Sequence, residues 1–364
     1  MKQNRIIISI WSDPSMYLNL MFLLNYLLKK KFKIILICKK IENSNDFYFF
    51  IKKNPNLNVI QTNLTGKLGY IKFLYLKYCY NKKLNPKILI SINFVSMFFS
   101  YFLDLKKTRW IYYNFDFDLN TKFNNFIEKI FIKKTDHILI PSQSRLKVYK
   151  KNFNRKNKIY SINNCFSKEL KIKKLKNYNK FYKKKYLIRL GSFSNFHALK
   201  EIALSTKYWK KNISLIMAGK SYDGYFEELK KFVKSNNLKK VILLKDVNYY
   251  VWFSLLKRAI AGFALYDPIN TSHNYMGGTS QKLNNYIYCN IPSLISKNPD
   301  FYVFNKKYKT SISVKNNPKD IAEKVNKILK NKDLYFFLKK KNKEAFNKEF
   351  NFEKQIKKIE KLFT

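Results

Sequence analysis

The chain has 364 residues, of which 46% are hydrophobic and 17% aromatic, so it is long enough for two packed domains and too apolar for a disordered protein. Its 73 lysines and arginines against 23 acidic residues give a formal net charge of +50. This charge admits a nucleic-acid partner, an anionic membrane surface or an acidic substrate. Because Lys, Asn, Ile, Phe and Tyr are abundant together while Gly and Pro are scarce, an AT-rich coding bias also accounts for it.

Along the first half of the chain, short apolar strands alternate with helices. Fully apolar strands of this length are typical of parallel strands that are covered on both faces. The predicted strands are "RIIISIW" at 5–11, "KIILIC" at 33–38, "NVIQTN" at 58–63, "KILISI" at 87–92, "RWIYYNF" at 109–115 and "HILI" from 137, and the predicted helices lie at 16–31, 67–83 and 120–133.

A segment without periodicity, "SKELKIKKLKNYNKFYKKK", interrupts this alternation and is typical of a charged linker. The alternation then resumes. Strands are predicted for "YLIRLGSF", "ISLIMAGK", "VILLKDV", "AIAGFALYD" and "IPSLISK", with helices at 195–209, 227–238 and 251–258 and a basic helical tail from 320.

Two successive series of this kind predict an α/β protein with two Rossmann-like domains that face each other across a cleft. The expected boundaries are 1–165 for the first domain, 166–185 for the basic linker and 186–345 for the second domain, followed by a C-terminal helix at 346–364 that can cross back to the first domain.

The cysteines and the apolar stretches narrow the class of protein further. The four cysteines are scattered, with no C-x-x-C pair, so we expect buried thiols in a reducing compartment rather than disulfides or a zinc site. The most apolar run, at 88–103, is shorter than the roughly 20 residues that span a bilayer and carries Asn93 near its middle. With no recognisable targeting signal, we expect a cytoplasmic protein that can bind peripherally to the inner face of a membrane.

Ligands of open parallel sheets bind beyond the carboxyl ends of the strands, which directs attention to the loops that follow them. The longest such loop leads through Gly277 and Gly278 to a helix that begins after Ser280. Glycines admit close approach to the backbone, a serine can cap the helix, and the helix N-terminus with Lys282 in its first turn favours an anion. The segment therefore predicts a site for a nucleoside diphosphate, with an ordinary capped helix as the alternative.

The stretch "AIAGFALYDPINTSHNYMGGTSQKLNNYIYCNIPSLIS" resembles the donor-binding segment of GT-B-fold glycosyltransferases, the bacterial group 1 or family 4-like enzymes. The matching residues are Ser280, Lys282, Leu283, Tyr286 and Pro292. "HILIPSQSRL", "YSINNCF" and "DVNYYVWFSLLKRA" are more loosely similar to other segments of the family. The resemblance implies that the second domain binds a nucleotide sugar and the first an acceptor. The implied donor-binding residues are Gly191, Ser192, His197, Gly219, Lys220, Gly277, Gly278, Thr279, Ser280, Lys282 and Asn285.

The sequence departs from the family pattern at several of these positions. Gly277 and Asn285 stand where many retaining members carry glutamates, and Ser192 and His197 stand where an Arg and a Lys often serve the phosphates. Lys282 is therefore the main expected phosphate cation, and the choice between retaining and inverting transfer stays open.

An inverting enzyme needs a base near the acceptor hydroxyl, and carboxylates are scarce in this chain. Asp13, after the first strand, and Asp116, after "RWIYYN", are the candidates. A turn residue before Pro14 is an equally good interpretation of Asp13, and Asp118 can cap the next helix.

The sequence thus predicts a glycosyltransferase that moves a sugar from a nucleotide-diphosphate donor to a cell-surface glycan or lipid-linked acceptor in the synthesis of envelope polysaccharide. Neither a cofactor nor a metal is expected, because cations and helix termini can hold the diphosphate. The alternatives are an epimerase on the same fold, a catalytically reduced binding or scaffold protein, and a nucleic-acid-binding protein. The sequence shows no helix-turn-helix, zinc-finger spacing or ribonucleoprotein aromatic motif, which disfavours the last of these. Anionic lipid is an expected partner, although Lys67, Lys72 and Lys77 do not share one helical face.

Overall fold

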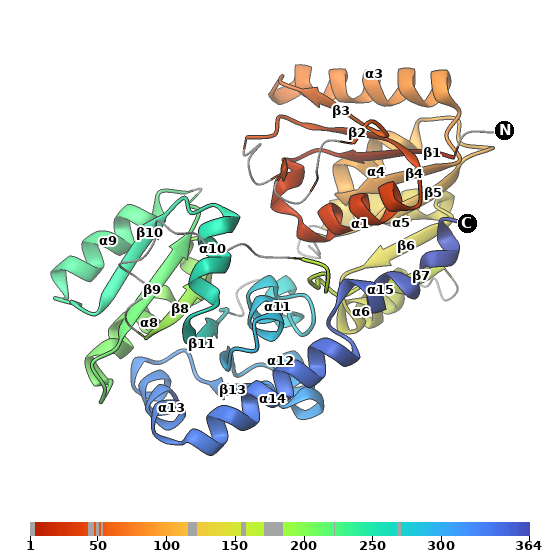
Figure 1. Cartoon of the computed structure of the whole chain (residues 1–364). Coiled ribbons are helices and arrows are strands. Elements are labelled where there is room, and N and C mark those ends of the chain that lie inside the picture. The colour runs from red at the N-terminus through yellow and green to blue at the C-terminus, as the bar shows by residue number, and fades with distance from the viewer. Residues whose placement is uncertain are drawn as a thin grey trace. The chain divides into compact units, whose positions relative to one another are not determined.

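The computed structural model describes residues 4–42, 47–48, 51, 54–115, 122–153, 158–170, 185–221, 223–267 and 271–364. By its internal contacts the chain divides into two units, Met1–Asn163 with Gln355–Thr364, and Asn164–Lys354. Each unit contains one parallel sheet flanked by helices (Figure 1). The last residues of the chain therefore belong to the first unit.

The first unit holds a seven-stranded sheet in the order β3-β2-β1-β4-β5-β6-β7. All neighbouring strands are parallel. The strands are β1 (Arg5–Ile10), β2 (Lys33–Lys39), β3 (Leu57–Thr62), β4 (Ile88–Ile92), β5 (Arg109–Tyr113), β6 (His137–Ile140) and β7 (Ile159–Ser161). The helices are α1 (Leu18–Lys29), α3 (Gly66–Leu84), α4 (Asn93–Tyr101), α5 (Lys122–Phe131) and α6 (Gln143–Phe153).

The C-terminal segment of the chain is held on the first unit by polar contacts. It contains α15 (Phe352–Lys357) and the short 3-10 helix η7 (Glu360–Leu362). The hydroxyl of Tyr26 donates to Glu360 at 2.8 Å, and the Arg109 guanidinium donates to the carbonyl of Leu362 at 2.6 Å.

The second unit holds a six-stranded parallel sheet in the order β10-β9-β8-β11-β12-β13. Its strands are β8 (Tyr186–Leu190), β9 (Ser214–Gly219), β10 (Val241–Lys245), β11 (Ala259–Ala264), β12 (Ser293–Ser296) and β13 (Ser311–Val314). Its helices are α8 (Leu199–Ser205), α9 (Tyr225–Ser235), α10 (Tyr249–Leu256), α11 (Gln281–Tyr288), α12 (Pro299–Tyr308), α13 (Pro318–Lys330) and α14 (Lys332–Lys348).

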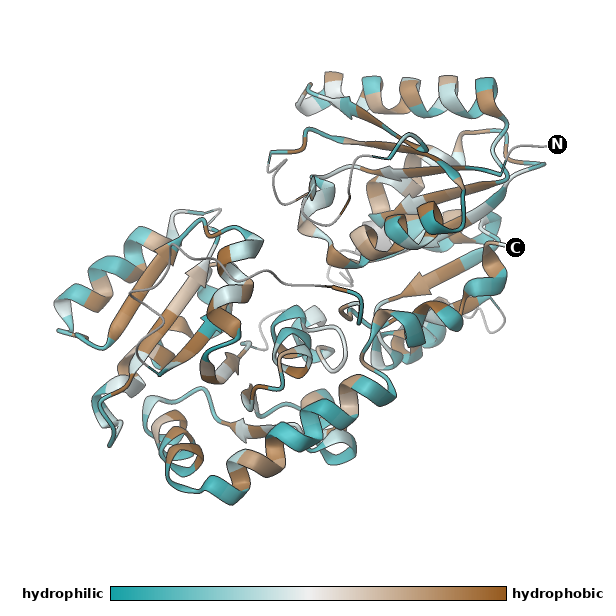
Figure 2. Ribbon diagram, in the orientation of Figure 1, coloured by the Kyte–Doolittle hydropathy of each residue, from teal (hydrophilic) through white to brown (hydrophobic). Residues whose placement is uncertain are grey.

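Hydrophobic strands form the centre of each unit, as Figure 2 shows by their colour. In the second unit, Leu187 of β8, Met217 of β9 and Phe263 of β11 are fully buried in one cluster with side chains of α8, α9 and α13. Burial of this apolar surface is the main term that stabilises the layers. The sequence predicted such strands from their uninterrupted apolar character, and this prediction is confirmed.

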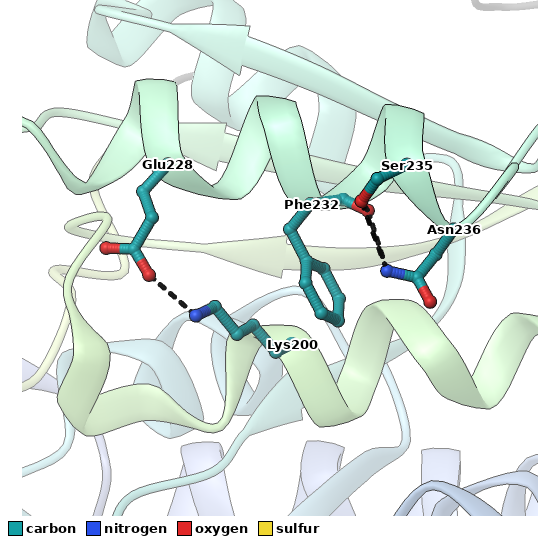
Figure 3. Close-up of polar contacts among 5 residues, drawn as sticks. All are labelled: Lys200, Glu228, Phe232, Ser235 and Asn236. Atoms are coloured by element: carbon teal, nitrogen blue, oxygen red, sulfur yellow. Dashed lines mark hydrogen bonds and ion pairs between the residues drawn. The ribbon is translucent and has the colours of Figure 1, made fainter.

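At the rim of this core, α8 and α9 are joined by a surface ion pair. Lys200 of α8 lies 2.6 Å from the carboxylate of Glu228 on α9, and its ammonium also lies 5.4 Å from the ring of Phe232 (Figure 3). At the end of α9, the side chain of Asn236 donates to the carbonyl of Phe232 at 3.0 Å and so occupies one of the terminal carbonyls of the helix.

The second unit differs from the sequence prediction in several places, among them α12, which was not predicted. The predicted helix at 195–209 is broken into two 3-10 turns and the short α8, because Ala198 takes a left-handed φ of 48° that ends the first turn. The strand β13 was not predicted, since its short sequence "SISV" alternates serine with apolar residues and has no clear boundary signal.

Two parts of the sequence prediction lie outside the described residues: most of the basic linker, and Asp118 with its proposed cap. Within the described residues, no helix combines the length and apolar character needed to cross a bilayer.

Candidate functional site

The candidate site lies where the chain reverses its direction across the second sheet. From β8 the chain adds β9 and β10 on one side, and it then returns to the other side of β8 with β11. The carboxyl ends of two adjacent strands at such a switch point leave room for a ligand between their loops. Gly191 follows β8 and Tyr266 follows β11, so both lie at this edge.

Helix α11 begins beside these two loops with Ser280 as its N-cap. The Ser280 hydroxyl accepts a hydrogen bond from the backbone N–H of Leu283 at 3.2 Å, which confirms the predicted cap. The same hydroxyl lies 2.7 Å from that of Tyr266. The first turn of α11 is thereby fixed against the end of β11, with the positive end of the helix dipole at the site.

The loop before α11 is held in one shape by asparagine side chains. Gly278 takes a φ of 82°, which favours glycine, and its carbonyl accepts from the Asn284 amide at 3.0 Å. The Asn164 amide donates to the carbonyl of Thr279 at 2.9 Å. Gly277, Gly278 and Thr279 thus belong to a braced turn rather than a loose loop. Neither asparagine was predicted to act in this way.

Three predicted residues meet at the edge of the sheet: Gly191, Gly219 and Lys282. A Cβ at Gly219 would lie 1.8 Å from the carbonyl oxygen of Gly191, so these two backbones touch in a way that only glycine permits. A Cβ at Gly191, where φ is +126°, would lie 2.7 Å from Cε of Lys282. The lysine side chain therefore lies across the backbone of Gly191, which places its ammonium at the end of β8.

A second cation at this edge, Arg189, was missed in the sequence. Arg189 is 1% exposed, and one of its guanidinium nitrogens donates to the carbonyl of Gly191 at 2.7 Å. The other terminal nitrogen is buried without a hydrogen-bond partner. The sequence signal was available, since an arginine inside "YLIRL", an otherwise apolar and fully buried strand, requires an explanation.

These cations are buried without a carboxylate partner among the described residues. Burial lowers the pKa of Lys282 well below its usual value, and the positive charge of Arg189 lowers it further. Burial likewise lowers the pKa of Arg189 to about 10. Two desolvated like charges side by side are unfavourable in the free protein. An anionic ligand would remove this cost, which is typical of a binding site.

Two histidines and a tyrosine complete the basic cluster. His197 is buried, its Nδ1 lies 2.8 Å from the Ser194 hydroxyl, and burial together with Lys282, Arg189 and His273 lowers its pKa well below the usual value. The ring of Tyr266 lies 5.3 Å from that of His197 and 5.4 Å from that of His273. His197, a predicted donor residue, therefore lies with Lys282, whereas Tyr266 and His273 were not predicted.

Asn285 is fully buried on the side of α11 that faces α10. Its amide oxygen accepts from the indole N–H of Trp252 at 3.0 Å, and its amide nitrogen donates to the carbonyl of Gln281 at 2.9 Å. These contacts hold α11 against α10. A contact of Asn285 with a bound donor stays a prediction.

Gly277 lies against a carboxylate supplied by another helix. Its N–H donates to Asp300 of α12, and a Cβ at Gly277 would lie 2.9 Å from the Asp300 oxygen. A larger residue at 277 would therefore collide with this carboxylate, which gives a physical reason for glycine at a position where the family often has glutamate.

Ser192 and Lys220, the remaining donor candidates, lie in the loops after β8 and β9. The carbonyl of Lys220 accepts from the N–H of Phe193 at 2.7 Å, so a backbone hydrogen bond joins the two loops. Ser192 is half-buried between Gly191 and Phe193. Their contacts with a donor stay predictions.

The two predicted bases belong to the first unit. Asp13 is buried, and its two carboxylate oxygens accept from the backbone N–H groups of Ser15 at 2.8 Å and Glu42 at 3.1 Å. This is the turn role that the sequence also allowed, and it leaves the carboxylate engaged. Asp116 lies outside the described residues.

Comparison with known proteins identifies the fold. No protein-family model and no curated protein matches the sequence. Sucrose-phosphate synthase from Thermosynechococcus elongatus aligns with a TM-score of 0.77 and 13% identity, covering 99% of this chain and 98% of that one. HepE from Anabaena, solved with UDP and glucose, aligns with a TM-score of 0.76, 10% identity and 99% coverage of both chains. A glycosyltransferase from Rickettsia africae aligns with a TM-score of 0.74 and 12% identity, covering 100% of this chain and 98% of that one.

At these identities the likeness shows the fold. The chain has the two Rossmann-like units of the GT-B fold, and the predicted fold class is confirmed.

Proposed function

We propose that this protein is a glycosyltransferase that takes its sugar from a nucleoside-diphosphate donor, with UDP as the first nucleotide to test. The proposed acceptor is a lipid-linked or cell-surface glycan, since a chain of net charge +50 is attracted to anionic membrane surfaces. The four cysteines are free, which accords with the cytoplasmic location that we propose with this function. HepE, a protein of the same fold, was solved in complex with UDP and glucose.

The observation that carries the proposal is the pair of buried cations, Arg189 and Lys282, at the switch point of the second sheet. Both touch the loop at Gly191, and neither pairs with a carboxylate among the described residues. The N-terminus of α11 opens beside them. A diphosphate would receive two charge-assisted interactions and the dipole of a helix at one place.

The same arrangement supplies what sugar transfer requires. When the bond between the sugar and the diphosphate breaks, negative charge develops on the leaving phosphate. Lys282, held over the ring of Tyr266 at 4.4 Å, and Arg189 are prearranged to stabilise that charge. His197, whose Nδ1 lies 2.8 Å from the Ser194 hydroxyl, can offer its other ring nitrogen to the phosphate. These side-chain cations supply the positive charge without a metal in our proposal.

The test compares UDP with uridine by titration calorimetry on the full chain. Lys282→Met keeps the length of the side chain and removes its charge, so it should weaken UDP binding at least about tenfold and uridine binding less than about twofold. Lys231→Met, an exposed lysine of α9, is the matched control and should change neither affinity. Equal UDP affinity in Lys282→Met and the parent would remove the phosphate assignment.

A second variant tests whether the buried charge of Arg189 destabilises the ligand-free protein. Arg189→Met should weaken UDP binding, yet leave the ligand-free protein as stable as the parent or more so, because an incompletely paired buried charge is removed. A thermal-shift series with and without UDP, in EDTA, measures both. Loss of UDP-induced stabilisation in EDTA would instead assign the phosphate contact to a metal.

Transfer itself is tested separately with a panel of UDP-sugars and lipid-linked acceptors. Release of UDP that depends on the acceptor is the expected result. Tight UDP binding with no transfer to any acceptor would favour the catalytically reduced binding protein.

A further inference from the structure

Helix α3 covers one half of the first sheet with a narrow buried face. Only Gly69, Phe73 and Lys77 of this helix are buried, and they lie on one side at spacings of four residues. Phe73 packs against Trp11 and Phe99 on this inner side. The opposite side of α3 therefore faces away from the sheet along its whole length.

That outward side is apolar. Leu68, Ile71, Tyr75 and Tyr78 follow one another at spacings of three, four and three residues, and they are 68%, 63%, 64% and 52% exposed. Such spacing places four large side chains in one stripe on a helix. Leu64, 43% exposed just before the helix, extends the stripe. Figure 2 shows hydrophobic colour recurring along α3. Contiguous exposed apolar residues of this kind mark an interaction surface.

Lysines border the stripe. By helical periodicity Lys67 lies along one flank, Lys72 and Lys83 lie along the other, and Lys82 lies at its C-terminal end. All four are exposed, and the helix contains no Asp or Glu. The lysines at 67, 72 and 77 share no face because Lys77 points inward, where its ammonium donates to the carbonyl of Ser96 at 2.6 Å. The exposed lysines are those that frame the apolar stripe.

We propose that the outward face of α3 docks on an anionic lipid surface. Leucine and isoleucine side chains can enter the boundary between headgroups and acyl chains, and tyrosines suit its polar edge. The flanking lysines reach the phosphates of the headgroups. A second copy of the chain would bring two rows of lysines together without any acidic partner on the helix, and a nucleic acid would leave the apolar stripe without a role.

The test is co-sedimentation of the full chain with vesicles of phosphatidylcholine alone or mixed with phosphatidylglycerol. The parent should bind only the mixed vesicles. Leu68→Ser/Ile71→Ser/Tyr75→Ser should lower the partition coefficient at least about tenfold, because buried apolar area is lost. The matched control is Tyr302→Ser/Val303→Ser, an exposed apolar pair on α12 that is 64% and 66% exposed, and it should bind as the parent does.

Charge is tested apart from apolar area. Lys67→Gln/Lys72→Gln leaves the stripe intact and should lower partitioning roughly tenfold or more in low salt. Both sets of variants should keep the UDP affinity of the parent. The membrane proposal and the proposed nucleotide site can therefore each fail without the other. Equal partitioning of the triple variant and the parent would overturn the proposal. So would a concentration-dependent dimer, seen by sedimentation velocity, that only the triple variant abolishes, since the face would then bind a second copy.

Discussion

At the scale of single residues, the proposed nucleotide site is built on two glycines for two different reasons. Gly191 has a φ of +126°, a region that L-residues rarely enter. Gly219 has no unusual backbone, but its α-carbon lies so near the carbonyl of Gly191 that no side chain fits. This contact draws the loops after β8 and β9 together and leaves the Gly191 backbone open to Lys282. Glycine is therefore required at these positions by the close approach of neighbouring groups and not only by backbone conformation.

The close contact predicts a large cost for the smallest substitution. Gly219→Ala should lower the free energy of unfolding by about 2–4 kcal/mol, because backbone must move to admit the methyl group. Gly224→Ala is the control, since its Cβ would meet nothing within 4 Å and only its φ of +78° opposes the change. It should cost about 1 kcal/mol. Urea unfolding of both variants measures this, and equal costs would contradict the packing argument.

At the scale of elements, α3 packs one side against the first sheet and exposes the other to solvent. Its inner side buries Lys77, whose ammonium donates to Ser96 at 2.6 Å and to the hydroxyl of Ser100 at 2.5 Å. The serines are linked in turn to Ser9 and Ser91 of the central strands. No described carboxylate balances the lysine, and burial lowers its pKa well below the usual value. The helix is thus attached to the sheet by a polar network that surrounds the buried amino group of Lys77.

This burial gives stability a pH dependence of known sign. Below about 10.5 the unfolded chain holds a proton on Lys77, whereas the folded protein holds one only below its lowered pKa. Between those values the unfolded state binds more protons, so the free energy of unfolding should rise with pH. Lys77→Met should remove this contribution to the slope and be at least as stable as the parent at pH 7.

Urea unfolding at pH 7 and pH 9.5 measures the difference. Lys83→Met, an exposed lysine at the end of the same helix, should keep the slope of the parent. A slope in Lys77→Met equal to that of the parent would contradict the assignment of this contribution to Lys77.

At the scale of the whole molecule, the positive charge is largely unbalanced. The chain has 73 basic and 23 acidic residues, and the ion pairs found among the described residues, such as Lys30 with Glu360, lie at the surface. Pairs of this kind contribute little. The folded state therefore carries a repulsion that the expanded chain relieves, and salt should screen it.

The midpoint of thermal unfolding should accordingly rise when KCl is raised from about 50 mM to about 500 mM. NaCl should have the same effect at equal ionic strength, because screening does not depend on the cation. A midpoint that falls with salt would mean that attractive surface pairs outweigh the net repulsion.

The sequence by itself determined the features that depend on neighbouring residues. Uninterrupted apolar runs predicted the strands, and Ser280 before "QKL" predicted the start of α11 with Lys282 in its first turn. The family resemblance led to the fold through these same residues. Arg189 could have been noticed in the sequence as a charged residue in an apolar strand. Its role depends on its contact with Gly191 and on the nearby Lys282, and a local sequence pattern does not show that these residues meet.

Only the tertiary structure decided which residues meet. The order of the strands sets β8 beside β11, and this places Arg189, Tyr266 and Lys282 at one edge although they are far apart in the chain. The same holds for the carboxylate of Asp300 at Gly277 and for the inward turn of Lys77. Periodicity and caps act over a few residues, whereas burial and charge are set by whatever the fold packs alongside. The burial and charge of the two cations on which the proposed function rests are therefore set by the tertiary structure.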